Sequence, residues 1–197
     1  MKKKKMFAGM AVIGIILTAG IWKWNYSQTK IKECLRDNII RFHIRAKSDD
    51  EKDQRNKLSV RDAVIAYMSP YMENVRTKEE AVRIIKENRK GIEKTANKVL
   101  RQCGEKAKVN VYLTTEEFPK INYGSYEFPE GIYDALRIDI GKAQGHNWWC
   151  VMFPDLCVTK DDEMEINQKA KKKMKKLLGE KTVKSLENHS YFQWLWK

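Results

Sequence analysis

The sequence predicts an α+β protein with a single domain, in which a mainly antiparallel sheet carries two long helices on one face. The predicted order is one strand, two helices and then two or three strands, so helices and strands are segregated along the chain. About 170 residues remain after the apolar N-terminal segment, which suits one domain and not two. A membrane-targeting helix precedes this domain and a basic helical tail follows it.

The N-terminal segment predicts export across a membrane. Four lysines at residues 2–5 precede 17 uncharged, mostly apolar residues at 6–22. A helix of that length spans about 25 Å, close to the minimum for a hydrocarbon core of ~30 Å. Lysines favour the cytoplasmic side, so the chain from about residue 25 onward is translocated. A buried core helix is the less usual meaning of such a terminal pattern.

Residues 1–25 are therefore predicted to be a signal peptide or a membrane anchor, and both alternatives stay open. The small residues Thr18, Ala19 and Gly20 offer a cleavage point. Trp22 and Trp24 resemble an interfacial aromatic belt, which suits a retained anchor.

The first half of the domain begins after a charged stalk at residues 26–38. Residues 39–46 alternate, with Ile40, Phe42 and Ile44 on one face, which predicts a half-buried strand. A helix is expected to start at residues 48–51, and Pro70 is expected to end or kink it. A second helix is expected from the capping box at residues 77–80 to the glycine at position 104.

The second half is predicted to consist mainly of strands. Residues 109–113 and 131–140 alternate between apolar and polar side chains, and 148–153 form a short apolar strand or buried segment. Residues 118–131 contain two prolines and two glycines and predict a loop. The tail at 159–197 includes a basic helix candidate at 164–178.

The net charge of +13 does not indicate a nucleic-acid-binding surface. Four of the positive charges belong to the N-terminal stub, many others to the tail, and the middle of the chain is nearly balanced. Neither zinc-finger spacing nor an RNA-binding aromatic motif is present, so no nucleic-acid partner is expected. The lysine-rich tail either contacts an anionic membrane surface or cell-wall polymer, or forms a solvated helix face.

The search for catalytic groups finds no enzyme signature. His146 and Cys150 are four residues apart, but the apolar surroundings of Cys150 would raise its thiol pKa and weaken it as a nucleophile. Cys150 and Cys157 flank a likely turn and are close enough in sequence for a disulfide. Cys34 and Cys103 cannot be paired from sequence. We expect no catalytic residue, no metal and no cofactor.

Trp148 and Trp149 are neighbours in a predicted strand and should point to opposite faces of the sheet. One can enter the core while the other faces outward as an interface anchor. The alternative is that loops bury both of them.

Several motifs occur together in a fixed order: Phe42-His43-Ile44-Arg45-Ala46-Lys47-Ser48-Asp49, Val60-Arg61-Asp62-Ala63-Val64, Tyr123-Gly124, Phe128-Pro129-Glu130-Gly131-Ile132-Tyr133 and Asn147-Trp148-Trp149-Cys150-Val151-Met152-Phe153-Pro154-Asp155-Leu156-Cys157. Behind an export signal, this set resembles the stage II sporulation protein R family of endospore-forming bacteria. The resemblance covers about residues 39–158. The chain departs from the usual family pattern at Lys47, Glu130 and Asp155, and the tail matches nothing in it.

The resemblance implies a secreted signal without catalytic activity. Such proteins are exported across the forespore membrane into the intermembrane space, where they trigger a membrane-embedded aspartic protease that processes pro-sigma-E. We expect the partner contact at Trp148, Trp149, Phe153, Pro154, Asn147 and Arg45, with Arg61 a further rim charge or ion pair. Fold stability is the alternative role for each of these residues. An exported cell-wall enzyme and a lipid- or cell-wall-binding protein are the competing functions.

Overall fold

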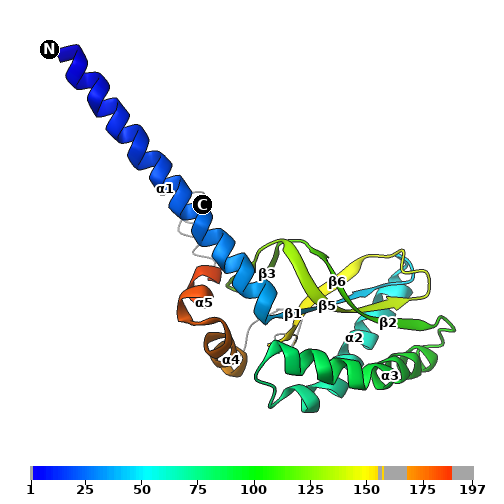
Figure 1. Cartoon of the computed structure of the whole chain (residues 1–197). Coiled ribbons are helices and arrows are strands. Elements are labelled where there is room, and N and C mark those ends of the chain that lie inside the picture. The colour runs from blue at the N-terminus through cyan, green and yellow to red at the C-terminus, as the bar shows by residue number, and fades with distance from the viewer. Residues whose placement is uncertain (1, 155–156, 158–167, 188–197) are drawn as a thin grey trace.

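The computed structural model describes residues 2–154, 157 and 168–187, with side chains from residue 14 onward except at residue 169 (Figure 1). Its elements, in chain order, are α1 (Lys2–Asn38), β1 (Ile40–Arg45), α2 (Glu51–Met72), α3 (Lys78–Gln102), β2 (Val109–Phe118), β3 (Ile121–Tyr123), β4 (Tyr126–Phe128), β5 (Gly131–Ile140), β6 (Asn147–Phe153), α4 (Gln168–Leu178) and α5 (Glu180–Leu186).

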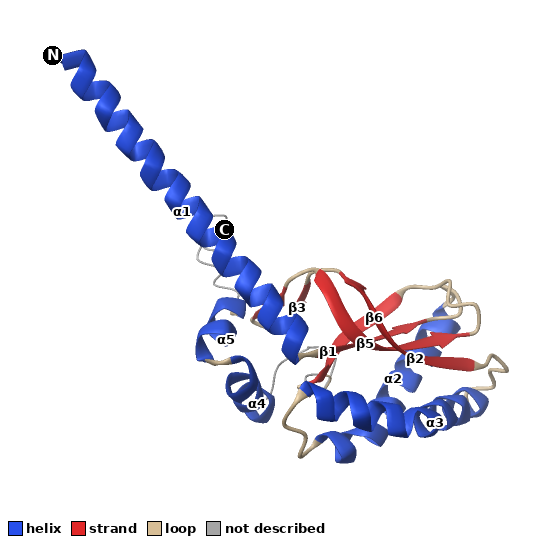
Figure 2. Ribbon diagram, viewed as in Figure 1, coloured by secondary structure: helices blue, strands red, loops and turns tan. Residues whose placement is uncertain are grey.

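The four long strands form one mixed sheet in the order β2-β5-β1-β6. β1 runs parallel to β5, whereas the β1–β6 and β2–β5 pairs are antiparallel. Helices α2 and α3 pack together on one face of this sheet (Figure 2). The predicted α+β class, with a mainly antiparallel sheet and two long helices on one face, is confirmed.

Strand β1 lies at the centre of the core. Ile40, Phe42 and Ile44 are fully buried on the face that α2 and α3 cover. The opposite face of β1 is buried as well, because Arg41 is 0% and His43 only 2% exposed. The prediction of a half-buried strand is therefore wrong for these two residues. Side chains from β2 and from the β3–β4 hairpin cover them.

The segment at 118–131, predicted as a loop, is mostly strand. β2 extends to Phe118, and β3 and β4 form a separate two-stranded hairpin. Gly124 has a φ of +54° in the two-residue turn between them, a conformation that glycine adopts without steric cost. Tyr123, Tyr126 and Phe128 are buried, so the hairpin is held by aromatic packing rather than by the main sheet.

Helix α1 is continuous from Lys2 to Asn38 and includes both the predicted leader and the predicted stalk. Its last turns pack against α4 and α5, where the Cys34 sulfur lies 3.8 Å from the Leu178 carbonyl oxygen. The predicted tail helix at 164–178 is observed from Gln168, and residues 164–167 lie outside the described part of the chain. Helix α5 was not predicted; glycine at position 179, with a φ of +80°, separates it from α4.

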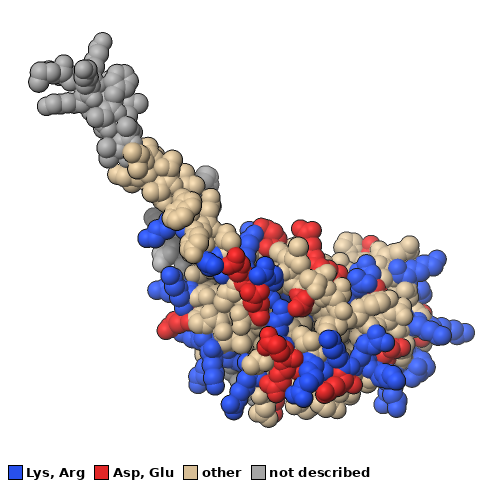
Figure 3. Space-filling view, viewed as in Figure 1, with Lys and Arg blue, Asp and Glu red and all other residues tan. Residues whose placement is uncertain are grey.

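The exposed part of α1 is apolar. Figure 3 shows an uncharged stretch of this helix projecting from the domain. Its exposed apolar side chains, at 61–71% exposure, are Ile15, Ile16, Leu17, Ile21, Trp22 and Trp24. Where side chains are described, no helix is both long and apolar enough to cross a bilayer. Residues 6–13 of the predicted apolar run have no described side chains.

Candidate partner-binding face

The two adjacent tryptophans of β6 lie on opposite faces of the sheet. Trp148 is on the helix-covered face, where it meets Phe42 edge-on at 5.9 Å between ring centroids. The guanidinium of Arg61 on α2 lies 5.0 Å from the Trp148 ring. Trp149 is on the other face, stacked on the His43 ring at 4.6 Å and 12°. Both indoles are half-buried, so neither prediction, full burial or free exposure, describes them.

The face that carries Trp149 also holds a chain of ion pairs across β1, β5 and β2. We call it the open face and define it by Arg45, Asp139, Arg137, Glu116, His43, Tyr112 and Trp149. Arg45 donates two hydrogen bonds to Asp139, at 2.7 and 2.6 Å. Arg137 lies 3.5 Å from Asp139 and 3.4 Å from Glu116. Positive and negative groups therefore alternate across three strands, and Asp139 and Arg137 are each held between two oppositely charged neighbours.

Aromatic rings flank this ionic chain. The Arg137 guanidinium lies 4.5 Å from the centroid of Tyr112, which is 38% exposed. On the other side, Phe118 meets Trp149 edge-on at 4.8 Å. An arginine stacked on an aromatic ring keeps its fork in a fixed orientation at little entropic cost. The open face is thus a rigid surface of rings and paired charges.

His43 lies at the buried end of this row of ion pairs. Burial lowers its pKa, against the opposing effect of the Glu116 carboxylate. Its Nε2 lies 2.9 Å from Glu116 Oε1, so Nε2 carries the proton and donates to the carboxylate. Its Nδ1 is buried and has no hydrogen-bond partner in the described residues.

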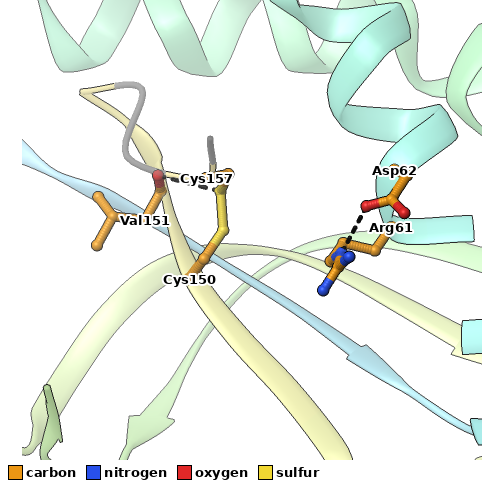
Figure 4. The surroundings of a disulfide bond; sticks show 5 residues. All are labelled: Arg61, Asp62, Cys150, Val151 and Cys157. Atoms are coloured by element: carbon orange, nitrogen blue, oxygen red, sulfur yellow. Dashed lines mark hydrogen bonds and ion pairs between the residues drawn. A yellow bond between two sulfur atoms is a disulfide. The ribbon is translucent and has the colours of Figure 1, made fainter. Parts of the chain in front are cut away.

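A disulfide fixes the end of β6. Cys150 and Cys157 are bonded, with their Cα atoms 5.6 Å apart, which confirms the predicted bridge (Figure 4). The Cys157 sulfur lies 3.2 Å from the Val151 carbonyl oxygen, a close contact rather than a hydrogen bond because a disulfide sulfur has no proton. The bonded Cys150 sulfur cannot act as a nucleophile. Cys34 and Cys103 are free thiols.

The structure separates the expected partner-contact residues into two groups. Asn147, Trp149 and Arg45 lie together, because Asn147 pairs with Arg45 in the β1–β6 register and all three point to the open face. Phe153 is 1% exposed and Pro154 is buried, so their side chains belong to the packed interior.

Trp148 and Arg61 also lie on the side that α2 covers. The Arg61 side chain is 11% exposed and its Nε donates to Asp62 at 2.7 Å (Figure 4).

Sequence reasoning missed the acidic and basic partners on β2 and β5. Glu116, Arg137 and Asp139 occupy alternate positions in strands that were otherwise predicted from their apolar residues. Their shared face follows from the register between β2 and β5, which pairs Tyr112 with Arg137 and Asn110 with Asp139. Within the described part of the chain, no group of three metal-ligating side chains comes together.

Comparison with known proteins supplies the family. Residues 36–163 match the stage II sporulation protein R family, and this range holds β1 to β6 together with α2 and α3. The chain belongs to the stage II sporulation protein R family. It is 33% identical over 155 residues to "Stage II sporulation protein R" of Bacillus subtilis (strain 168), which covers 76% of this chain and 69% of that protein. No solved structure matches the chain.

The family match includes every residue of the open face and the disulfide. Helices α4 and α5 lie beyond its end at residue 163. The part of this chain that is shared with the stage II sporulation protein R family is therefore the sheet, its two covering helices and the aromatic hairpin.

Proposed function

We propose that this protein is an exported sporulation signal that activates a membrane-embedded aspartic protease, which then processes pro-sigma-E. The observation that carries the proposal is membership of the stage II sporulation protein R family across the whole sheet domain. In this proposal the protein acts by binding and performs no chemistry of its own. The disulfide supports this. Cys150, with His146 four residues away, is the cysteine considered as a nucleophile, and its sulfur is bonded to Cys157.

The open face is the surface we assign to the protease contact. Protein interfaces are enriched in aromatic residues and arginine, and a few such residues carry most of the binding energy. Trp149, Tyr112, Arg45 and Arg137 provide these side chains on one rigid surface. Their alternating charges would favour a partner with the complementary pattern and exclude others.

Activation requires that the protein bind the active arrangement of the protease more tightly than the inactive one. A shift from about 1% to about 99% active protease needs roughly 10⁴-fold preference, or about 5.5 kcal/mol. Three well-packed anchors at about 2 kcal/mol each provide that amount. A contact centred on Trp149 is therefore large enough for a switch, without any covalent step.

The projecting helix α1 supports export. Residues 1–25 serve in this proposal as signal peptide or anchor, and the domain at 39–158 works in the intermembrane space. The large apolar side chains on the projecting part of α1 are mostly exposed, which suits a helix that meets lipid. The protein is secreted if the leader is cleaved and membrane-anchored if it is retained.

An anionic membrane surface is a second candidate partner. A cleft of about 440 Å³ lies between α4 and the α2–α3 turn. Its basic side chains are Arg76, Lys172, Lys173 and Lys176, and Phe153, Val75 and Leu177 supply apolar lining. Charge reversal at Lys172 and Lys176 in the full chain should weaken binding to phosphatidylserine vesicles and leave binding to phosphatidylcholine vesicles unchanged.

Reconstitution in a host that does not sporulate tests the main proposal. The full chain is co-expressed with the candidate protease and pro-sigma-E, and processing is followed by immunoblot. We expect mature sigma-E only when this protein is present and exported. Processing that is equal without it contradicts the proposal, and so does cleavage of peptidoglycan or peptides by the purified protein, which would favour a cell-wall enzyme.

A further inference from the structure

Arg41 is enclosed by aromatic rings beneath the β3–β4 hairpin. Its side chain is 0% exposed, and its guanidinium carbon lies 4.8 to 5.8 Å from four ring centroids. These rings come from the end of β2, from both hairpin strands and from β5, and they belong to Phe118, Tyr123, Phe128 and Tyr133. We call this group the Arg41 cage. Ring faces attract a cation but accept few of its N–H bonds.

The cage leaves the hydrogen-bonding groups of Arg41 unused. Nε, Nη1 and Nη2 are buried and make no hydrogen bond with any described residue. A buried arginine is normally paired with a carboxylate, because an isolated ion in a protein interior is costly. The Tyr123 hydroxyl is buried and unpartnered in the same way, whereas the Tyr133 hydroxyl donates to the Pro129 carbonyl. Two kinds of donor therefore lie together without an acceptor.

Tyr123 stays a proton donor at neutral pH. Burial raises the pKa of its phenol to about 12, although the nearby Arg41 charge acts in the opposite direction. Burial also lowers the pKa of Arg41, but a guanidinium group is not deprotonated in proteins. The cage thus presents a cation and a neutral hydroxyl donor, a set that matches an oxyanion.

The cover of the cage is a short hairpin that lies outside the main sheet. β3 and β4 have three residues each, and in the described chain they pair with each other and not with the main sheet. A two-stranded hairpin is marginally stable alone. Beyond aromatic packing, the hairpin is held by Tyr126, whose backbone bridges Glu187 and whose hydroxyl lies 3.1 Å from its carboxylate. Displacing the hairpin would remove the Tyr123 and Phe128 rings from the cage and leave Phe118 and Tyr133, which belong to the four-stranded sheet.

We propose that Arg41 is a receptor for a carboxylate of the partner protein, an aspartate or glutamate side chain that enters when the β3–β4 hairpin lifts. The inference rests on the proposed function and deepens it, because Arg41 lies on the same face of β1 as His43 and Arg45. The guanidinium fork fits a planar carboxylate with two parallel hydrogen bonds, and Tyr123 supplies a third donor.

The carboxylate site is tested without the protease by thermal unfolding of the full chain in sodium acetate against sodium chloride at equal ionic strength. At acetate tenfold above its dissociation constant, we expect the unfolding midpoint to rise by about 3–6 °C. The Arg41→Met variant should show no such rise, and Arg89→Met, a control arginine on α3, should keep it. Equal rises in wild type and Arg41→Met overturn the proposal.

The effect of Arg41 on stability separates a receptor from a packing role. An unpaired buried charge is a burden on the fold, so Arg41→Met should unfold at or above the wild-type temperature and lose at least tenfold in pro-sigma-E processing. A lower unfolding temperature with processing reduced only in proportion to the folded fraction assigns the cage to packing and overturns the proposal. If processing fails for wild type while the acetate effect persists, the proposed partner is wrong and the receptor stands.

Tyr123→Phe provides a second test that does not depend on the stability of the arginine variant. It removes one donor and keeps the charge and the ring. We expect acetate affinity to fall at least threefold, and unchanged affinity overturns the role of the cage. A rise with phosphate but not with acetate at equal ionic strength assigns the site to phosphate groups such as lipid headgroups and also contradicts the carboxylate.

Discussion

Removal of the disulfide between Cys150 and Cys157 is expected to lower the free energy of unfolding by about 2.5 kcal/mol. The two residues are separated by 7 positions, so the bridge closes a loop of eight residues. For a loop of this length, the lost freedom of the unfolded chain is worth roughly 2.5 kcal/mol at 25 °C. The expected fall in the unfolding midpoint is then about 5–10 °C.

Urea unfolding of the Cys150→Ala/Cys157→Ala double variant measures this loss. Tryptophan fluorescence is a suitable signal because Trp148 and Trp149 directly precede Cys150. The matched control replaces the free thiols Cys34 and Cys103 by alanine, which removes two cysteines without removing a cross-link. The reasoning is refuted if the double variant loses no more stability than the control, or if reducing agent leaves the wild-type midpoint unchanged.

Three further substitutions test local parts of the structure. His43→Phe should remove a pH dependence of stability. Because the pKa of His43 is lowered in the folded protein, the wild type is fully stable above about pH 6.5 and loses up to about 1.4 kcal/mol per pH unit below it, whereas the variant does not. Urea denaturation at pH 7.5 and at pH 5.5 compares the two proteins. Gly145→Ala should cost at least about 2 kcal/mol, because a Cβ there would overlap the Ser48 carbonyl oxygen, whereas Gly14→Ala meets nothing within 4 Å; equal urea midpoints would contradict this. Thr77→Ala should cost about 1 kcal/mol in the same urea assay, because the hydroxyl accepts from the Glu80 N–H at the start of α3, and Thr77→Ser should restore it.

The helices and the long strands could be predicted because their signals are local. The capping box at Thr77 fixed the start of α3, which is observed one residue later. The apolar residues of α3 recur at helical spacing, and those of β5 alternate. Pro70 was expected to end or kink α2, and the helix does end two residues after it. Such features depend on neighbours within a few positions.

The aromatic hairpin and the open face could not be predicted because both depend on contacts between distant segments. Prolines and glycines at 118–131 favoured a loop, but burial of the Tyr123 and Phe128 rings in a second layer stabilises strands there. From the alternation of the sequence, Arg41 is expected to point outward from the strand. Only the fold shows that a second layer covers it.

The tail shows the same limit. Its lysines were the conspicuous feature, yet the buried residues Ala170, Met174 and Leu178 at four-residue spacing dock α4 on the base of α1. Lys172 and Lys176 remain exposed. The lysine pattern therefore predicted the exposed surface of α4 but not the apolar contact that holds the helix.

The most direct measurement of the central claim is pro-sigma-E processing in the reconstituted host by Trp149→Ala and by Trp148→Ala, each normalised to the amount of folded, exported protein. The account predicts that Trp149→Ala loses at least tenfold per folded molecule, because its indole lies on the open face. Trp148→Ala should lose stability but keep its activity per folded molecule, because its indole lies between Phe42 and Arg61. Full activity of the Trp149 variant, or a specific loss confined to Trp148, would contradict the account.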